Sequence, residues 1–254
     1  HASILDGIRL GEAKQYKFRH NDLKALKELI QKHHTAFKNI FIVVESVYEL
    51  DGDLAPLLEI SELIKALDTV FLIVDEAHAI GVFGKQGRGL CNSLGIENKC
   101  FARIYTYGKA MGCQGAVIVG SEILRNYLIN FSRPFIYTTA LPNQNIDAIL
   151  HAYQLLIETD QKERLQDNIS YFYSKTSTMK NVVRSQSAIH SLIAGSNEEA
   201  DRLKNAMEAR GIHVRAVKSP LVKEGSERIR FCIHAYNTKN EIDMLLAAIH
   251  ESTK

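Results

Sequence analysis

Hydrophobic residues in the first half of the chain alternate between short continuous runs and runs at helical spacing. The continuous, β-branched runs at residues 40–45, 70–75, 103–107 and 116–120 predict strands buried on both faces. Apolar residues at helical spacing predict helices over residues 23–34, 56–67 and 122–130. This alternation of strand and helix is typical of a mainly parallel α/β sheet with helices on both faces.

The second half of the chain has a different pattern. A stretch at helical spacing runs from 143 to 180 without proline or glycine and predicts one long helix. After it, the pattern predicts strands at 188–194, 213–217 and 228–233, with helices at 198–210 and 241–250. We therefore predict part of a large domain over residues 1–145, and a connecting helix with a small C-terminal α+β domain over residues 146–254.

Composition excludes several classes of protein. The chain has 254 residues, of which 46% are hydrophobic and 24% charged, and this is ordinary globular composition. A net charge of +2 argues against a general binder of nucleic acid or anionic membranes, and no run approaches the roughly 20 apolar residues of a membrane span. Four cysteines without a C-x-x-C pair predict a reducing, cytoplasmic setting. Because the chain opens at His1 without methionine, we expect an N-terminal segment to be missing.

Three places break the hydrophobic pattern, and we expect all three at the carboxyl ends of strands, where open α/β sheets bind ligands. The first is Asp75-Glu-Ala-His78, directly after an apolar strand. The second is Lys109, in a glycine-rich bend; a lysine desolvated in a pocket has a lowered pKa, and its amine can form a Schiff base. The third is the pair Arg228 and Arg230, on one face of a predicted strand and suited to binding a carboxylate.

The letters D-E-A-H also suggest a helicase-type ATPase. That function requires a phosphate-binding loop of the form G-x-x-x-x-G-K-[ST]. The two Gly-Lys pairs of the chain, at 84–85 and 108–109, continue with Gln86 and Ala110 and do not match it. The nucleotide interpretation therefore has little support in the sequence.

Six motifs occur in order along the chain: H-A-S-I-L-D-G at 1–7, F-R-H-N-D at 18–22, V-E-S-V-Y-E-L-D-G-D at 44–53, D-E-A-H-A-I-G-V-F-G at 75–84, T-Y-G-K at 106–109 and I-Y-T-T-A-L-P at 136–142. Together they resemble the pyridoxal-phosphate enzymes of fold type I, and among these the α-oxoamine synthases. The resemblance implies a fold type I transferase with a mainly parallel sheet, a smaller C-terminal α+β domain, and pyridoxal 5'-phosphate as cofactor.

The resemblance also implies roles for five residues at the cofactor. Lys109 would hold the cofactor as an internal aldimine and act as the base. Asp75 would pair with the pyridinium nitrogen, and His78 would hydrogen-bond the phenolic oxygen and assist catalysis. His1 would stack on the ring, and Thr106 would contact the phosphate. An ionised carboxylate behind the ring suits this chemistry, because it keeps the ring nitrogen protonated.

Substrate recognition is implied by the arginine pair. In the family the second arginine of this R-x-R pattern binds the carboxylate of the amino acid, so Arg230 is the predicted residue and Arg228 the alternative. The chain departs from the family at Glu49, where relatives commonly have a serine near the cofactor. A carboxylate there could change the pKa of the cofactor imine or point elsewhere, and we assign Glu49 no role in the site.

Within the family, the segments 115–120, 133–142 and 214–230 are most similar to the synthases of the biotin pathway. These condense L-alanine with pimeloyl-CoA or a pimeloyl-carrier thioester. The alternatives are another member, such as a glycine C-acetyltransferase, and a non-catalytic partner subunit. The resemblance further implies a homodimer with a shared active site to which residues 137–139 contribute, and no metal, nucleic acid or membrane as a partner.

Overall fold

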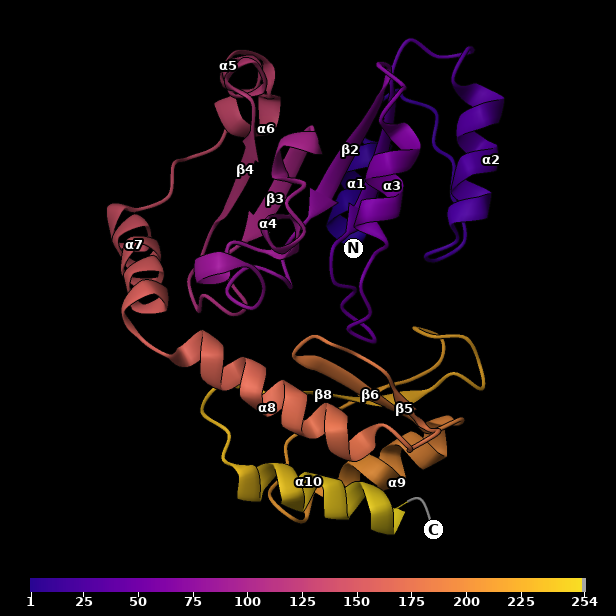
Figure 1. Cartoon of the computed structure of the whole chain (residues 1–254), viewed down its shortest axis with the longest axis vertical. Coiled ribbons are helices and arrows are strands. Elements are labelled where there is room, and N and C mark those ends of the chain that lie inside the picture. The colour runs from indigo at the N-terminus through magenta and orange to yellow at the C-terminus, as the bar shows by residue number, and fades with distance from the viewer. Residues whose placement is uncertain (253–254) are drawn as a thin grey trace. The chain divides into compact units, whose positions relative to one another are not determined.

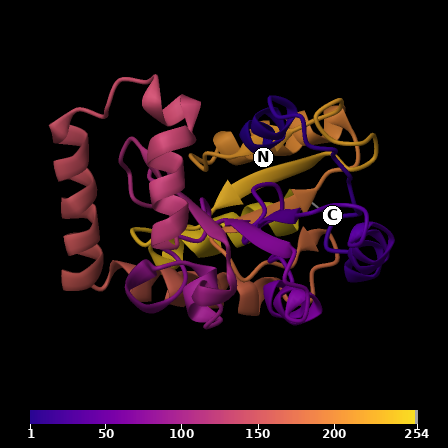
Figure 2. The same ribbon diagram turned by 90° about the horizontal axis from the view of Figure 1, so that it is seen from above.

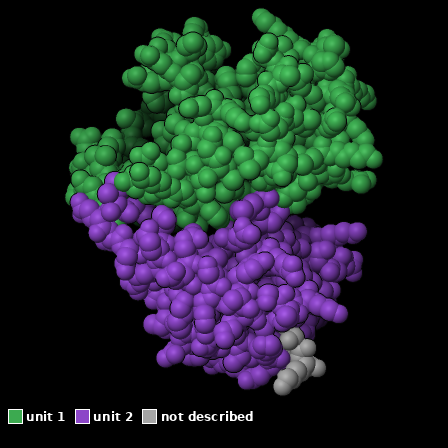
Figure 3. Space-filling view, in the orientation of Figure 1, with its two compact units in different colours: residues 1–47, 55–155 green, residues 48–54, 156–254 purple. Residues whose placement is uncertain are grey.

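The computed structural model describes residues 1–252 and divides the chain into two compact units (Figure 3). Unit 1 comprises His1–Val47 and Ala55–Leu155, and unit 2 comprises Tyr48–Leu54 and Leu156–Lys254. The predicted boundary after residue 145 falls inside a helix, and the chain changes unit after Leu155. The assignment of 48–54 to unit 2 was not predicted.

Unit 1 is built on a four-stranded sheet with the order β1-β2-β3-β4 (Figure 1). Strands β1 (Ile40–Glu45), β2 (Val70–Asp75) and β3 (Ala102–Thr106) are parallel, whereas β4 (Ala116–Gly120) forms an antiparallel hairpin with β3. The prediction of a mainly parallel sheet is confirmed. It succeeds because these β-branched runs are short and are closed by polar residues.

Two of the longer helices of unit 1 begin at a capping side chain. The Asp22 carboxylate accepts a hydrogen bond from the Ala25 amide at the start of α2, and the Ser121 hydroxyl accepts one from the Leu124 amide at the start of α5. The helices are α1 (Ala2–Arg9), α2 (Leu23–His33), α3 (Leu57–Ile64), α4 (Leu90–Ser93), α5 (Glu122–Phe131), α6 (Arg133–Ile136) and α7 (Asn143–Glu158). The short helices α1, α4 and α6 were not predicted.

No side chain of helices α5, α6 and α7 is fully buried in the described structure. Figures 1 and 2 both show α7 separated from α5. Large hydrophobic side chains are therefore exposed along them: Ile123, Tyr127, Phe131, Phe135, Ile136, Ile146, Leu150 and Leu155. An apolar surface of this extent usually marks a place where another chain or segment packs.

Unit 2 combines a second sheet with three helices on one of its faces. The sheet is antiparallel with the order β5-β6-β8-β7, formed by β5 (Val182–Val183), β6 (Ile189–Ile193), β8 (Arg228–Cys232) and β7 (Arg215–Val217). The helices are α8 (Gln161–Thr176), α9 (Asn197–Glu208) and α10 (Lys239–Ser252). The Phe172 ring packs against the rings of His190 and Phe231 in the core between them.

The prediction of one helix over residues 143–180 is wrong. The chain forms two helices instead, because α7 ends at Glu158 and α8 begins at Gln161. The intervening Thr159-Asp160 pair explains the break, since both residues have low helix propensity and aspartate favours the position before a helix. Among the described residues, no helix is long and apolar enough to cross a membrane.

The buried histidine of unit 2 makes its stability depend on pH. Burial lowers the pKa of His190 from 6.5 to about 4, and its Nε2 has no hydrogen-bond partner among residues 1–252. The unfolded chain binds the proton near pH 6.5 and the folded chain only near pH 4, so stability is lost as the pH falls through this window. We expect a loss of about 2 kcal/mol between pH 7 and pH 5.

The replacement His190→Leu should remove this pH dependence. Urea unfolding of the wild type and of the variant, followed by circular dichroism at pH 7 and pH 5, measures it. If both proteins lose the same stability between the two pH values, His190 is not the cause.

Candidate active site

The ends of the parallel strands bring several predicted residues to one edge of the unit 1 sheet. Asp75 is the last residue of β2 and lies opposite Glu45 of β1 and Ile104 of β3. Thr106 is the last residue of β3, and the loop that carries Lys109 follows directly. The first two of the three predicted places are therefore at carboxyl strand ends, as expected.

Asp75 is a buried carboxylate that is held in place by the backbone. One carboxylate oxygen, Oδ1, accepts a hydrogen bond of 2.8 Å from the Ala77 amide. The Asp75 carbonyl accepts hydrogen bonds from the amide and the hydroxyl of Ser46 at the end of β1. No cationic side chain within residues 1–252 forms an ion pair with Asp75, although it is only 7% exposed. A buried carboxylate of this kind is suited to a cationic ligand.

Glu76, the next residue, is fully buried and has a structural role that was not predicted. Its two carboxylate oxygens accept hydrogen bonds of 2.7 Å from the amides of Leu90 and Cys91, at the start of α4. The Ser46 hydroxyl donates a third hydrogen bond to Glu76. Glu76 therefore ties the ends of β1 and β2 to α4. Ser46 lies in the quoted 44–53 motif, which was the available sequence signal.

Gly89 leaves the space that Glu76 occupies, and this gives a stability prediction. A Cβ at Gly89 would lie 2.5 Å from Glu76 Oε2, in a backbone conformation with φ of +104°. Gly89→Ala should therefore cost about 3 kcal/mol or more, because it adds the loss of a charge-assisted hydrogen bond to the backbone strain. Gly95→Ala is the matched control, since Gly95 has φ of +66° and no atom near its Cβ.

For the control we expect about 1 kcal/mol. Thermal and urea unfolding of both variants measure the difference. Equal destabilisation of the two would show that Glu76 contributes nothing to the cost at Gly89.

The Lys109 loop contacts the loop that follows Asp75. A Cβ at Gly81, where φ is +79°, would lie 3.0 Å from Ala110 Cβ, so only glycine allows this close approach. The Lys109 loop itself is closed by backbone hydrogen bonds, in which the Tyr107 amide donates to the Gly115 carbonyl and the Cys113 amide to the Tyr107 carbonyl. This packing brings the segments of Asp75, His78 and Lys109 together in unit 1.

The expectation of a desolvated lysine is wrong for the described structure. Lys109 is exposed, as are its neighbours Gly108 and Ala110. The contacts of this loop with the Gly81 segment are made by Ala110 and Met111, which follow Lys109, and they do not bury the Lys109 side chain. His78, in contrast, is partly buried.

Thr106 and His1 flank this part of the sheet. The Thr106 hydroxyl oxygen is buried and has no hydrogen-bond partner among the described residues, so it is available to an oxygen-rich group such as a phosphate. The backbone nitrogen of His1 lies 2.6 Å from Glu45 Oε1, beside the residue that pairs with Asp75. The His1 ring is exposed and its Nδ1 lies 2.8 Å from the Ser3 hydroxyl at the start of α1.

The two predicted arginines lie in unit 2 on one strand, as predicted, but at the start and middle of that strand and not at its carboxyl end. Both lie inside β8, because the antiparallel sheet continues through them. Arg228 is buried and forms an ion pair with Asp51, with 2.6 Å between its guanidinium nitrogen and Asp51 Oδ1. Arg230 donates from Nε to the Glu49 carbonyl at 2.6 Å. The Glu49 side chain is exposed.

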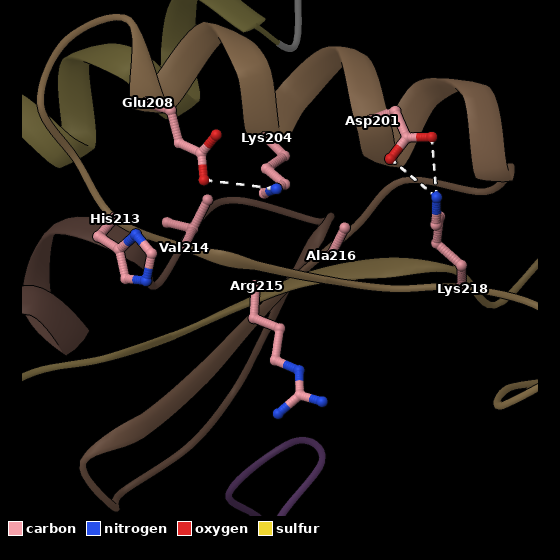
Figure 4. A pocket seen from close by; sticks show the side chains of 8 residues that line it. All are labelled: Asp201, Lys204, Glu208, His213, Val214, Arg215, Ala216 and Lys218. Carbon is pink, nitrogen blue, oxygen red and sulfur yellow. Dashed lines mark hydrogen bonds and ion pairs between the residues drawn. The ribbon is translucent and has the colours of Figure 1, made fainter.

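A pocket of about 340 Å³ lies elsewhere in unit 2, between α9 and β7 (Figure 4). Two ion pairs lie in the wall of this pocket, Lys218 with Asp201 and Lys204 with Glu208. None of the predicted site residues lines this pocket, which is formed by Asp201, Lys204, Glu208, His213, Val214, Arg215, Ala216 and Lys218. Four of its charged side chains are neutralised in these two ion pairs, so we do not assign it to the candidate site.

Comparisons with known proteins identify the family and the fold. The sequence model of the family described as aminotransferase class I and II matches residues 1–249. The chain is 37% identical over 269 residues to an 8-amino-7-oxononanoate synthase of Emericella nidulans, covering 98% of this chain and 65% of the relative. The chain thus spans about two thirds of that relative's length.

Two solved structures show the same fold. A structure of 8-amino-7-oxononanoate synthase from Francisella tularensis is 34% identical, with a TM-score of 0.85, and the match covers 100% of this chain and 72% of that one. A structure described as SPT with PLP internal aldimine is 28% identical, with a TM-score of 0.91, and the match covers 99% of this chain and 64% of that one. The prediction of fold type I is confirmed.

Proposed function

The chain belongs to the aminotransferase class I and II family, and we propose that it is the major part of a pyridoxal-phosphate-dependent synthase that joins L-alanine to a pimeloyl thioester. The observation that carries this proposal is the packing of the Lys109 loop on the Gly81 segment at the sheet edge that ends in Asp75. The 8-amino-7-oxononanoate synthases that this chain resembles support the choice of substrates.

The residues present fit the cofactor. Asp75 offers a buried carboxylate without a cationic partner in the described structure, and this suits a protonated ring nitrogen. Thr106 offers a buried hydroxyl without a partner there, and this suits a phosphate oxygen. His78 follows Asp75 by three residues and the His1 backbone nitrogen lies beside Glu45; these positions support the proposal that both side chains would contact the ring. Lys109 supplies the amine.

Lys109 would act twice in the reaction. Its amine would hold the cofactor in the resting enzyme and, once free, would remove the proton from Cα of L-alanine. Pyridoxal phosphate, when bound, supplies the electron sink that makes this proton removable. Asp75 would favour a proton on the ring nitrogen, and His78 would donate a hydrogen bond to the ring oxygen.

The chemical outcome is a decarboxylative condensation. A carbon–carbon bond forms between alanine Cα and the thioester carbonyl, and the carbon–sulfur bond breaks to release a thiol. The bond from Cα to the alanine carboxylate then breaks, carbon dioxide leaves, and a proton is returned to Cα. The product is 8-amino-7-oxononanoate. Arg230 would hold the alanine carboxylate until this step, because a guanidinium binds a carboxylate through two parallel hydrogen bonds.

The choice of substrates is tested by comparing substrate pairs. The full-length protein loaded with pyridoxal phosphate should release thiol fastest from pimeloyl-CoA with L-alanine. Glycine with acetyl-CoA tests the alternative that the chain is a glycine C-acetyltransferase. L-Serine with palmitoyl-CoA tests whether the chain has the activity of a serine palmitoyltransferase, the enzyme seen in one of the similar structures. A higher kcat/KM for either of these pairs would overturn the assignment, and no turnover with any pair would favour the non-catalytic partner subunit.

A homodimer with a shared active site completes the proposal. The exposed apolar side chains of α5, α6 and α7 support it, because a permanent interface usually buries roughly 2,000 Å² or more of mostly apolar surface. Residues 137–139, between α6 and α7, are exposed and would contact the partner's site. Sedimentation of the full-length protein at submicromolar concentration should show a dimer. A stable monomer that keeps its cofactor and full activity would rule out the shared site.

The four cysteines bear on the compartment in which this reaction takes place. None of them forms a disulfide, including Cys91 and Cys100, whose thiols form a hydrogen bond with 3.7 Å between the sulfur atoms. Free thiols this close are expected where the surroundings are reducing. This supports a cytoplasmic location.

A further inference from the structure

The second sheet has one apolar and one basic face. Along β8, Ile229 and Phe231 are buried in the core with the helices. Because side chains alternate along a strand, Arg228 and Arg230 lie on the opposite face. The loop Tyr48–Leu54 lies against this basic face, where its Glu49 carbonyl accepts a hydrogen bond from Arg230.

Arg215 adds a third arginine to the basic face. In the β7–β8 pair, Arg215 is directly opposite Arg230, and directly opposite residues of an antiparallel pair share a face. Figure 4 shows the Arg215 side chain pointing away from α9, while Lys204 and Glu208 lie on the α9 side. Arg215 is exposed, so its guanidinium is accessible from solvent.

Two of these three arginines have no acidic partner among the described residues of unit 2. Arg228 is neutralised by Asp51. Arg230 uses Nε for the Glu49 carbonyl, but its terminal nitrogens donate to no oxygen of a described residue. Arg215 forms no ion pair within residues 1–252. Two unpaired like charges directly opposite each other on a sheet are destabilising, and an anion bound between them removes this repulsion.

We propose that Arg215 and Arg230 form a two-arginine site that binds the carboxylate of the amino-acid substrate. This inference rests on the proposed function, in which Arg230 alone has that role. Arg215 is then a second binding residue, placed on the neighbouring strand so that the carboxylate bridges the two guanidinium groups. Each contact is a charge-assisted hydrogen bond, and these are the strong ones in proteins.

The Asp51–Arg228 pair explains why the two arginines remain available. It fixes the loop Tyr48–Leu54 on the basic face, and the same loop holds Arg230 by Nε only. The carbonyl that holds Arg230 belongs to an acidic residue, Glu49. The Glu49 carboxylate forms no ion pair within residues 1–252, and its side chain is exposed. The loop thus orients Arg230 through a neutral carbonyl and leaves its charge for a ligand.

The test uses the full-length protein loaded with pyridoxal phosphate. The absorbance change of the bound cofactor gives the dissociation constant of L-alanine and, separately, of L-alaninamide, which lacks the carboxylate. Arg215→Gln should weaken L-alanine binding about tenfold or more and change L-alaninamide binding by less than about twofold. Arg230→Gln should weaken L-alanine further, and the double variant should lose less than the product of the two single losses.

Arg202→Gln is the matched control, because it removes one positive charge from α9, on the other face of the sheet. It should leave both dissociation constants unchanged. Unchanged L-alanine binding in Arg215→Gln would overturn the proposal, as would equal weakening of L-alanine and L-alaninamide. A change only in the KM of the thioester would assign Arg215 to the other substrate and also overturn it. A wild type that does not bind L-alanine would instead refute the proposed function itself.

Discussion

Replacing Lys109 by alanine is expected to reduce the rate of condensation at least about a thousandfold. The variant loses both the amine that holds the cofactor and the base that removes the Cα proton. Borohydride reduction followed by peptide mass mapping measures the first loss directly. In the wild type the cofactor should be fixed on the peptide that contains Lys109, and in the variant on no peptide.

Lys85→Ala is a suitable control, since Lys85 is also exposed in unit 1 and also follows a glycine. It should retain both the label on Lys109 and the activity. If the Lys109 variant still carried a covalently bound cofactor after reduction, the amine would have to be assigned to another lysine. Lys109→Arg tests whether a positive charge alone is sufficient, because arginine keeps the charge but cannot form the imine at neutral pH.

The second large effect is expected at Asp75. Asp75→Asn keeps the shape of the side chain and can still accept the hydrogen bond from the Ala77 amide, but it removes the negative charge. Breaking a buried ion pair by removing one partner costs about 3–5 kcal/mol, so proton removal from Cα should slow about a hundredfold or more. Exchange of the L-alanine α-proton in deuterated water, followed by NMR, measures this step without the thioester.

Asp68→Asn provides the comparison, because Asp68 is exposed just before the other end of β2. It should exchange the α-proton at the wild-type rate. The cofactor should remain attached to Lys109 in Asp75→Asn. Lys109→Ala therefore tests the attachment of the cofactor, and Asp75→Asn tests the removal of the Cα proton. Near-normal exchange in Asp75→Asn would show that this carboxylate does not support the ring nitrogen.

The strands of unit 1 could be predicted because their information is local. Residues 40–45, 70–75 and 116–120 are β-branched runs that end in polar residues or glycine, and the observed bounds match them. The same pattern predicts that Asp75 lies at the carboxyl end of its strand. The two-helix structure over 143–176 could not be read from hydrophobic spacing, because that spacing continues through the break.

The parts that could not be predicted depend on contacts between distant residues. The loop Tyr48–Leu54 belongs to unit 2 because its backbone carbonyls accept hydrogen bonds from Ser185, Ser191 and Arg230, which are 133, 141 and 181 positions away. The role of Glu76 depends in the same way on amides at the start of α4. The sequence identified Arg228 and Arg230 as a pair, but only their partners distinguish the buried ion pair of Arg228 from the more available Arg230.

The central claim is that this site joins an amino acid to an acyl thioester with loss of the amino acid's carboxylate. The most direct measurement supplies the full-length protein with pyridoxal phosphate, pimeloyl-CoA and L-alanine labelled with carbon-13 at the carboxyl group. Labelled carbon dioxide, free coenzyme A and unlabelled 8-amino-7-oxononanoate should appear in equal amounts by mass spectrometry. A condensed product that retains the label, or thiol release without any condensed product, would contradict this account.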